Sequence, residues 1–538
     1  MIKYFKQLTN RDYRVFLILF VLVAIGYANV VNGPMFFDDE HFIQVNKTIR
    51  SLKNIPEIYS SSVTEGAHIS GNFYRPNQQL VYALTFYFFK LNPVPYHIIP
   101  ILLHLLNAFF VFIILKKLSF SKMAGTLAAV LFLTHPVQTE SVSYISGLAG
   151  PLGLFFLLSA LLMYLKSLSI TFQSKKYVYY GISALLYILS LFSKENMLVF
   201  LPLSVILLVF VNAVSPIKVK RYIIFSVFVF LIISISYLFM RFELLDISET
   251  IGLTDKDNIY TRNLIVRLVT FVNVLWDYVV MIIYPVNLNY EKPYMAYTSL
   301  ASLRGIFGML LIVITVLSVI FYKRNKRVFL GICWFFCAMF PFTGVIPLNA
   351  MYLEHWLYIP IIGLTILIAT LFDYLISKKR AHIFLYIFIP LIIFYTGRNI
   401  ARNSEWADIE KFYLNELQYT DSSTRIYNNL GMYYADKKNF GKSIEYYNKA
   451  IAAGDFYAQP HHNLANIYLG QGDYNKAIEE LYLALKINPD FIYSLVKLYN
   501  LYFETNEITK AARMRTLIEN VEQGRKNDFN EIHAIITE

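Results

Sequence analysis

Long apolar segments recur along most of the chain, and this recurrence restricts the fold more than any other feature of the sequence. Runs of 18 or more apolar residues follow one another between Val15 and about Tyr395. A helix of this length spans a bilayer and satisfies its own backbone hydrogen bonds in lipid. Only 16% of the residues are charged, against about a quarter in soluble proteins. The sequence therefore predicts an all-α chain, with a polytopic helical membrane domain followed by a polar C-terminal part.

Eleven membrane spans fit the apolar runs. The first run is too long for the core of a signal peptide, so we expect it to be retained as a span. Two further apolar stretches, 78–91 and 264–284, would break the alternation of loop charge if they crossed the membrane. We expect both to lie on or dip into the outer face. The predicted spans are roughly 15–33, 97–117, 123–135, 148–167, 177–192, 196–214, 221–241, 304–322, 328–345, 354–377 and 382–397.

Loop charges alternate along the chain and predict its orientation. Six basic clusters contain almost no acid: Lys3/Lys6/Arg11/Arg14, Lys116/Lys117/Lys122, Lys166/Lys175/Lys176, Lys218/Lys220/Arg221, Lys323/Arg324/Lys326/Arg327 and Lys378/Lys379/Arg380. The other loops hold nearly all the acid: Asp38–Glu40, Glu140, Glu195, Glu243 to Asp257 and Glu354. Because basic loops stay in the cytoplasm, we expect a cytoplasmic N-terminus, with the first loop and the C-terminal part on the outer side. The net charge of +12 is then mostly a topology signal, and we expect no nucleic-acid partner.

The polar C-terminal part repeats with a period of 34 residues from about Ser422. This period and its small residues are typical of tetratricopeptide repeats, in which paired helices pack closely. Such units bind a peptide or protein on their concave face, or serve as a packing platform. We expect a membrane domain over 1–400, a linker helix over 401–421, repeats over 422–525 and a tail over 526–538. Leu430, Gly431, Tyr434, Ser443, Tyr447 and Ala450 recur as Leu464, Ala465, Tyr468, Ala477, Leu481 and Ala484, with a weaker third unit at Leu498, Tyr502 and Ala511.

A row of three acids follows the first span directly. Asp38, Asp39 and Glu40 stand in the segment FFDDEH, which the topology places on the outer face. One interpretation is structural, because Asp38 or Asp39 could cap the stretch that follows as a helix N-cap. Three consecutive acids in an aromatic context favour a functional role instead.

Further polar residues converge on the same predicted face. Charged groups at a membrane boundary are costly and mark functional sites by default. The mixture of carboxylates with arginine, lysine and histidine suits a phosphorylated lipid whose reacting carbon lies beside a base. Besides the acid row, the set comprises Arg75, His135, Glu140, Lys194, Glu195, Glu354, His355, Arg398 and Arg402.

Seven motifs in order, together with the repeats, resemble one known family. They are FFDDE, YRPNQQL, LNPVPYHIIPILLHLLNA, HPVQTESVSYISG, LFSKEN, YPVNLNYEK and LEHWLYIP. In this order, over about residues 30–525, the chain resembles the TMTC-type membrane glycosyltransferases. These belong to the GT-C superfamily, are related to the protein O-mannosyltransferases and carry C-terminal tetratricopeptide repeats.

The resemblance implies an inverting transfer of a sugar from a polyprenyl-phosphate donor to an acceptor, such as a protein hydroxyl, on the outer face. The catalytic aspartate of the first outer loop in GT-C enzymes maps onto Asp39 or Asp38, and we favour Asp39. A carboxylate can take the acceptor's proton as the new bond forms. The leaving lipid phosphate needs cationic donors, for which Arg75, Lys194 and His355 are the candidates.

Each phosphate candidate also has a structural interpretation. Arg75 could form a loop salt bridge with an acid, Lys194 could pair with Glu195, and His355 could be an interfacial anchor. Glu40, His135, Glu140, Glu195 and Glu354 are expected to support the site, with Glu140 ordering it or binding a metal ion. The sequence requires no cofactor and, without a D-x-D pattern, leaves use of a divalent metal open.

One motif departs from the family pattern. Where we expect SGRAD or SGRAE, the sequence has SGLAG at 146–150, with Leu148 and Gly150 in place of an arginine and an acid. The departure implies a changed sugar or acceptor, or reduced activity. A non-catalytic membrane scaffold is therefore the alternative function. A lipid-sugar flippase is less favoured, because the sequence lacks internal symmetry. We expect a bacterial cytoplasmic membrane with a periplasmic site, with the endoplasmic reticulum as the alternative.

Overall fold

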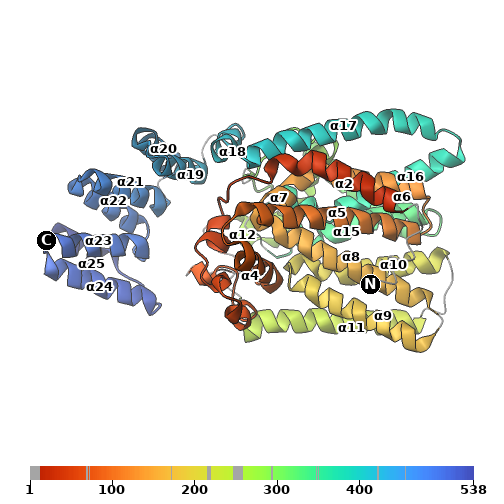
Figure 1. Cartoon of the computed structure of the whole chain (residues 1–538), viewed down its shortest axis with the longest axis horizontal. Helices are drawn as coiled ribbons and strands as arrows, with labels where there is room; N and C mark the ends of the chain where they lie inside the picture. The colour runs from red at the N-terminus through yellow and green to blue at the C-terminus, as the bar shows by residue number, and fades with distance from the viewer. Residues whose placement is uncertain are drawn as a thin grey trace. The chain divides into compact units, whose positions relative to one another are not determined.

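The structure is a computed structural model. Among the residues it describes, helices are the only regular secondary structure (Figure 1). This confirms the predicted all-α class. The chain divides into two units, Met1–Asp408 and Ile409–Glu538, which are described separately. Lys3, Lys6, Arg11 and Lys218 of the predicted basic clusters, and Asp257 of the acidic loops, lie outside the described residues. The structure describes residues 12–67, 71, 73–170, 172–214, 220–245, 247, 259–292, 295–346, 348, 350–420, 423–454 and 456–538.

The first unit is a bundle of long apolar helices. By length and composition, eight helical segments of the described residues suffice to cross a membrane: Tyr13–Val30, Pro93–Lys117, Ile145–Ser169, Glu195–Ala213, Ile224–Leu244, Leu264–Ile283, Leu303–Ile320 and Ala381–Trp406. These segments identify a membrane protein. The helices are α2 (Tyr13–Tyr27), α3 (Ile55–Ile58), α4 (Pro76–Phe89), α5 (Pro93–Lys117), α6 (Lys122–Thr134), α7 (Thr139–Ser143), α8 (Ala149–Ser169), α9 (Gln173–Leu191), α10 (Phe200–Val214), α11 (Lys220–Phe239), α12 (Ile259–Arg262), α13 (Leu264–Ile283), α14 (Leu303–Ile320), α15 (Lys326–Met339), α16 (Ile361–Ser377) and α17 (Ala381–Trp406).

Three of the predicted basic segments gather at one end of this bundle, called the basic end below. Asp12, just before α2, forms ion pairs with Lys116 at 2.6 Å and Lys122 at 3.2 Å. Arg327, at the start of α15, pairs with Asp373 of α16 at 2.8 Å. The same Arg327 donates a hydrogen bond to the carbonyl of Ser119, in the loop between α5 and α6. These contacts bring the loops 116–122 and 323–327 together, as the alternating charges predict.

Helix α13 does not run from one end of the bundle to the other. Near its start, Arg267 donates to the carbonyl of Gly344, which follows α15. Near its finish, the carbonyl of Ile282 accepts from His135, which follows α6. Because α6 and α15 both begin at the basic end, both ends of α13 lie toward the opposite end, called the site end below. This course is the one expected for a helix that lies on or dips into the outer face, although its 20 residues would suffice to span a bilayer.

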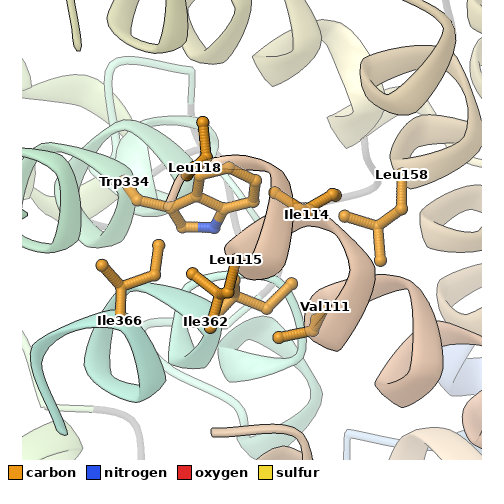
Figure 2. A pocket seen from close by; sticks show the side chains of 8 residues that line it. All are labelled: Val111, Ile114, Leu115, Leu118, Leu158, Trp334, Ile362 and Ile366. Atoms are coloured by element: carbon orange, nitrogen blue, oxygen red, sulfur yellow. The ribbon is translucent and has the colours of Figure 1, made fainter. Parts of the chain in front are cut away.

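The short helix α4 also lies at the site end, together with the loops that precede it (Figure 1). Its 14 residues are too few for a crossing, in agreement with the expectation for the stretch 78–91. A small cavity in the interior of the bundle is lined almost entirely by apolar side chains (Figure 2). Its lining is apolar apart from the indole of Trp334, whose N–H already donates to the carbonyl of Ile359 at 3.2 Å. The lining residues are Val111, Ile114, Leu115, Leu118, Leu158, Trp334, Ile362 and Ile366.

The second unit is an array of helix pairs. The pairs α19/α20, α21/α22 and α23/α24 follow the 34-residue period, and the predicted third unit is therefore present. The predicted tail 526–538 differs from expectation, because α25 packs Ile532 and Ile535 against the core of the last repeats. An apolar face closed by one more helix is a usual cap of such arrays. The helices are α18 (Ile409–Glu416), α19 (Thr424–Asp436), α20 (Phe440–Ala453), α21 (Ala458–Gln471), α22 (Tyr474–Ile487), α23 (Ile492–Glu504), α24 (Ile508–Glu522) and α25 (Phe529–Thr537).

Gly431 provides a test of the close packing within the first repeat. A Cβ atom at this position would lie 2.4 Å from the ring of Tyr447, so Gly431→Ala forces the α19/α20 pair apart. We expect a loss of about 1–3 kcal/mol in the stability of the repeats, measured by urea unfolding of the purified chain. Gly470→Ala is the control, because nothing lies within 4 Å of its added Cβ, and it should not destabilise. Equal midpoints for the two variants would contradict the packing.

Candidate functional site

Asp39 is buried in a turn that follows α2 and is held there by a distant segment. Its side chain is 1% exposed. One carboxylate oxygen accepts hydrogen bonds from the backbone N–H of Ser146 at 2.9 Å and from its hydroxyl at 2.5 Å. The other oxygen accepts from the N–H of Phe36 at 3.3 Å. Asp39 precedes the π-helix η2 (Glu40–Gln44) but makes no capping hydrogen bond to it, so the capping interpretation is wrong for this residue.

The environment of Asp39 keeps a proton on it to unusually high pH. Burial is the main cause, the charge of Asp38 adds to it, and the hydrogen bonds from Ser146 and Phe36 oppose it, so that the pKa rises from 3.8 to about 7. Asp38 is half-buried, and its backbone N–H donates to the hydroxyl of Tyr144 at 3.0 Å. The carboxylate of Glu40 has no hydrogen bond or ion pair with any residue that the structure describes. Of the three acids, Asp39 therefore has the properties of a base that works near neutral pH.

His355 is oriented by Glu140. One oxygen of Glu140 lies 2.6 Å from the His355 Nδ1, and the other accepts from the His355 backbone N–H at 3.0 Å. Burial acts to raise the pKa of Glu140, but His355 and the charge of Lys292 hold it below its ordinary value. The His355 side chain stays 27% exposed, and its Nε2 has no hydrogen-bond partner within the described part of the chain. The ring is thus fixed at Nδ1 by Glu140 and makes no hydrogen bond at Nε2 to a described residue.

Arg75 and Lys194 stand in contrasting situations. Arg75 makes a two-pronged ion pair with Glu195, at 3.0 Å from Nε and 2.7 Å from Nη2, which is the loop salt bridge that its structural interpretation predicts. Because Glu195 pairs with Arg75, it forms no ion pair with Lys194. The Lys194 Nζ makes no hydrogen bond or ion pair with the described residues. Burial, and secondarily the charge of Arg75, lower the pKa of Lys194 from 10.5 to about 8. Lys194 is therefore the more available cation for an anionic ligand.

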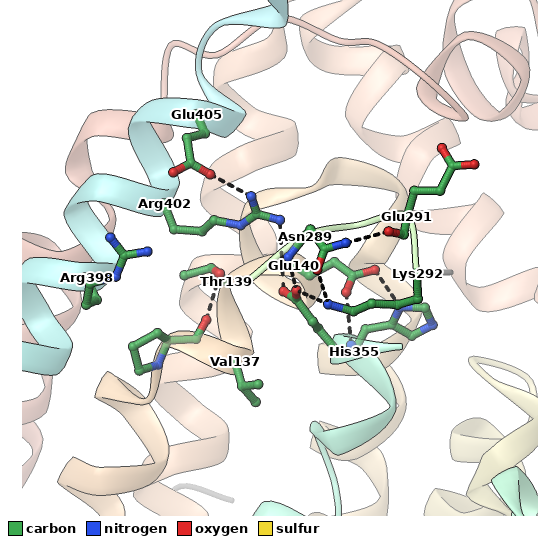
Figure 3. Close-up of polar contacts among 12 residues, drawn as sticks. Val137, Thr139, Glu140, Asn289, Glu291, Lys292, His355, Arg398, Arg402 and Glu405 are labelled. Atoms are coloured by element: carbon green, nitrogen blue, oxygen red, sulfur yellow. Dashed lines mark hydrogen bonds and ion pairs between the residues drawn. The ribbon is translucent and has the colours of Figure 1, made fainter. Parts of the chain in front are cut away.

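A second buried charge network adjoins His355 (Figure 3). Glu354 accepts from the N–H of Asn289 at 2.5 Å and from Lys292 at 3.0 Å, and its other oxygen lies 4.0 Å from Arg402. Arg402 also pairs with Glu405 at 2.6 Å, and Arg398 donates to the carbonyl of Val286 at 2.7 Å. Lys292 was not among the site residues predicted from the sequence. It could have been found from its place next to Glu291 in the motif YPVNLNYEK, because this motif follows α13 and lies at the site end.

One segment, residues 135–150, connects most of these groups. Within this segment, Glu140 binds His355 and Ser146 donates hydrogen bonds to Asp39. Gly150 lies next to Lys194, since an added Cβ would be 4.0 Å from Lys194 Nζ. His135 at its start is used structurally, because Val137 N–H donates to its Nδ1 and its Nε2 reaches the carbonyl of Ile282. The departure SGLAG lies within this segment.

The two departing residues have different surroundings. Leu148 is 1% exposed and packs in an apolar cluster with Phe42, Ile43 and Leu152. Gly150 borders both Ser141 and Lys194, because an added Cβ would lie 3.8 Å from Ser141 Oγ and 4.0 Å from Lys194 Nζ. The departure therefore preserves packing at one position and leaves a cation without a carboxylate at the other.

The described residues bring no group of three or more His, Cys, Asp or Glu side chains together in a way that could hold a metal ion. Glu140, the predicted candidate for a metal ligand, has both oxygens occupied by His355. Whether Glu140 orders the site or binds a metal ion stays a prediction.

Comparison with known proteins gives two results. A family model described as a tetratricopeptide repeat matches residues 422–490. The chain is also 24% identical over 455 residues to a protein O-mannosyl-transferase of Caenorhabditis elegans, covering 81% of this chain and 63% of the relative. It is 22% identical over 510 residues to protein O-mannosyl-transferase TMTC3 of Homo sapiens, covering 88% of this chain and 55% of the relative.

The predicted resemblance to the TMTC-type transferases is confirmed. A shorter stretch of 152 residues is 34% identical to protein O-mannosyl-transferase tmtc2 of Xenopus laevis, covering 27% of this chain. The chain spans 63% and 55% of the lengths of the two longer matches. The similarity extends over both units, so it concerns the membrane bundle as well as the repeats.

Proposed function

We propose that the chain is a membrane glycosyltransferase that moves a sugar from a polyprenyl-phosphate donor to a hydroxyl group of a protein. The observation that carries the proposal is the buried carboxylate of Asp39, held by Ser146 on the same segment that meets Lys194 and His355. This reaction needs a base for the acceptor proton and groups that bind the leaving phosphate. Asp39, with its raised pKa, would be the base, and Lys194 and His355 would bind the phosphate. The names of the similar proteins support a protein acceptor and transfer of mannose.

In the proposed reaction the acceptor oxygen attacks the anomeric carbon while Asp39 takes the hydroxyl proton. The bond between the anomeric carbon and the phosphate oxygen breaks, and polyprenyl phosphate leaves with the electron pair. Lys194 and the Nε2 of His355 hold the phosphate and offset its growing charge. Since acceptor and phosphate lie on opposite sides of the sugar, the configuration inverts.

Orientation and partners are part of the proposal. We propose that the site end faces away from the cytoplasm, toward the periplasm or a lumen, and the basic loops that gather at the other end support this orientation. The repeats recruit the acceptor protein, as arrays of this type commonly bind peptides or proteins. Arg75 is assigned to holding Glu195 and thereby to keeping Lys194 unpaired.

The test is transfer by the purified protein in detergent. We would supply a panel of radiolabelled polyprenyl-phosphate sugars with membrane extract as acceptor, and compare wild type with Asp39→Asn. Transfer to protein by the wild type alone is the expected result. If the wild type is inert with every donor, the transferase proposal is wrong, and a non-catalytic scaffold becomes the better account.

The pair Glu140 and His355 allows a double-mutant test of positioning. We expect His355→Ala to lower transfer about 100-fold and Glu140→Gln about tenfold. Because Glu140 acts through His355, the double variant should be no worse than His355→Ala alone. Asp12→Asn at the basic end is the control, and its effect should add to that of His355→Ala. Additive losses for Glu140 and His355 would contradict the positioning role.

A further inference from the structure

Phe37 has a backbone conformation that its position in the fold does not explain. Its φ is +62°, in the left-handed region that a bulky side chain rarely adopts. The other described non-glycine residues with positive φ are Lys90, Ser119, Lys379, Lys438 and Asn506, and each stands at or just after the end of a helix. Left-handed residues are usual there. Phe37 follows no helix, and strain of this kind persists where the surrounding structure enforces it.

The strained turn fixes the Phe37 ring and the Asp39 carboxylate together. The N–H of Phe36 donates to the Asp39 side chain, so that the turn closes over Phe37. The next N–H, of Asp38, donates to the hydroxyl of Tyr144. A change of φ at Phe37 would break these contacts, so ring and carboxylate hold a constant relation.

Aromatic rings from two distant segments contact Phe37, and a ring from a third segment packs behind them. Its ring centroid lies 4.9 Å from that of Tyr290 and 6.5 Å from that of Tyr144, both edge to face. Tyr144 in turn stacks on Trp406 at 5.2 Å and 22°. Tyr144 and Trp406 are buried, whereas Phe37 and Tyr290 are half-buried. The turn therefore holds a half-buried aromatic side chain, backed by buried rings, two positions before Asp39.

We infer that Phe37, backed by Tyr290, is the platform on which the transferred sugar packs. The inference rests on the proposed function and names its sugar subsite. A sugar ring has an apolar face of C–H groups, which an aromatic side chain covers while hydroxyl groups turn to polar neighbours. The strain at Phe37 is retained because it aims the ring at the sugar whose anomeric carbon must lie near the acceptor and Asp39.

The experiment compares two ligands that differ only in the sugar. Binding of the donor found active in the transfer assay, and of sugar-free polyprenyl phosphate, is measured by calorimetry on the full chain in detergent. We expect Phe37→Leu to bind sugar-free polyprenyl phosphate like wild type but the sugar-loaded donor about tenfold more weakly. Phe37→Tyr should bind both ligands like wild type.

Two small-residue variants separate strain from binding. Phe37→Gly and Phe37→Ala both remove the ring and should both weaken binding of the sugar-loaded donor, but only Phe37→Gly relieves the positive φ and should therefore melt at a higher temperature than Phe37→Ala. Unchanged or equally weakened binding of the two ligands by Phe37→Leu overturns the inference while leaving the transferase proposal intact. A wild type that transfers no sugar overturns the proposed function, and the sugar subsite falls with it.

Discussion

Asp39→Asn should lower sugar transfer about 10³-fold and leave the protein folded. The amide has nearly the shape of the carboxylate and its oxygen still accepts from Ser146, so the turn survives. It cannot take a proton from the acceptor hydroxyl. Transfer is measured as radiolabel passed to protein, and folding as the melting temperature of the purified variant.

The same substitution should stabilise the fold, by an amount that depends on pH. The folded chain keeps the Asp39 proton up to about pH 7, whereas the unfolded chain loses it near 3.8. Between these values the folded state binds more protons, so wild-type stability falls as pH rises, by on the order of 4 kcal/mol in all. Asp39→Asn has no such loss. Its melting temperature should therefore exceed that of wild type by more at pH 8 than at pH 5.

The pH profile of transfer supplies the control. Since the base must be deprotonated, activity should rise with pH through a midpoint near 7. The charge of Asp38 helps to raise the pKa of Asp39, so Asp38→Asn should retain activity and move that midpoint to lower pH. A stability gain from Asp39→Asn that does not grow with pH, or full activity in this variant, would contradict the assignment.

Much of the fold follows from local patterns in the sequence. Apolar run length predicts the bundle, and the spacing from Leu430 to Leu464 predicts the repeat array, because both depend on residues close together in the chain. Loop charge also predicts which loops gather at the basic end. Helix α25 was missed because Ile532 and Ile535 acquire a partner only once the preceding repeats have folded.

The pairing of charges within the site could not be predicted from the sequence. Lys194 and Glu195 are neighbours in sequence, but Glu195 pairs with Arg75, 120 positions away. Ser146, which donates hydrogen bonds to Asp39, lies 107 positions from it in the sequence. No sequence pattern around Ser146 predicts this contact. Such choices depend on how the long helices pack. The sequence can thus name many of the charged residues at the site end, but not Ser146 or Lys292, and not the contacts that leave Lys194 without an ion pair to a described residue.

Substitution of Lys194 is expected to have the second large effect on transfer. We expect Lys194→Met to lower transfer about 10²-fold and to weaken binding of sugar-free polyprenyl phosphate, because in the proposed reaction the ammonium holds the leaving phosphate. The pKa of Lys194 is lowered to about 8, so wild-type activity should fall again above that pH. Together with Asp39 this predicts a bell-shaped profile, measured as transfer rate against pH.

Lys194→Arg is the matched variant. A guanidinium stays charged at every accessible pH, so this variant should keep part of the activity and lose the fall above pH 8. If Lys194→Arg keeps the alkaline fall, the group that titrates there is another one. If Lys194→Met binds polyprenyl phosphate like wild type, the phosphate lies elsewhere, and the unpaired lysine would instead serve only to balance the charges of Glu195 and Glu140 around it.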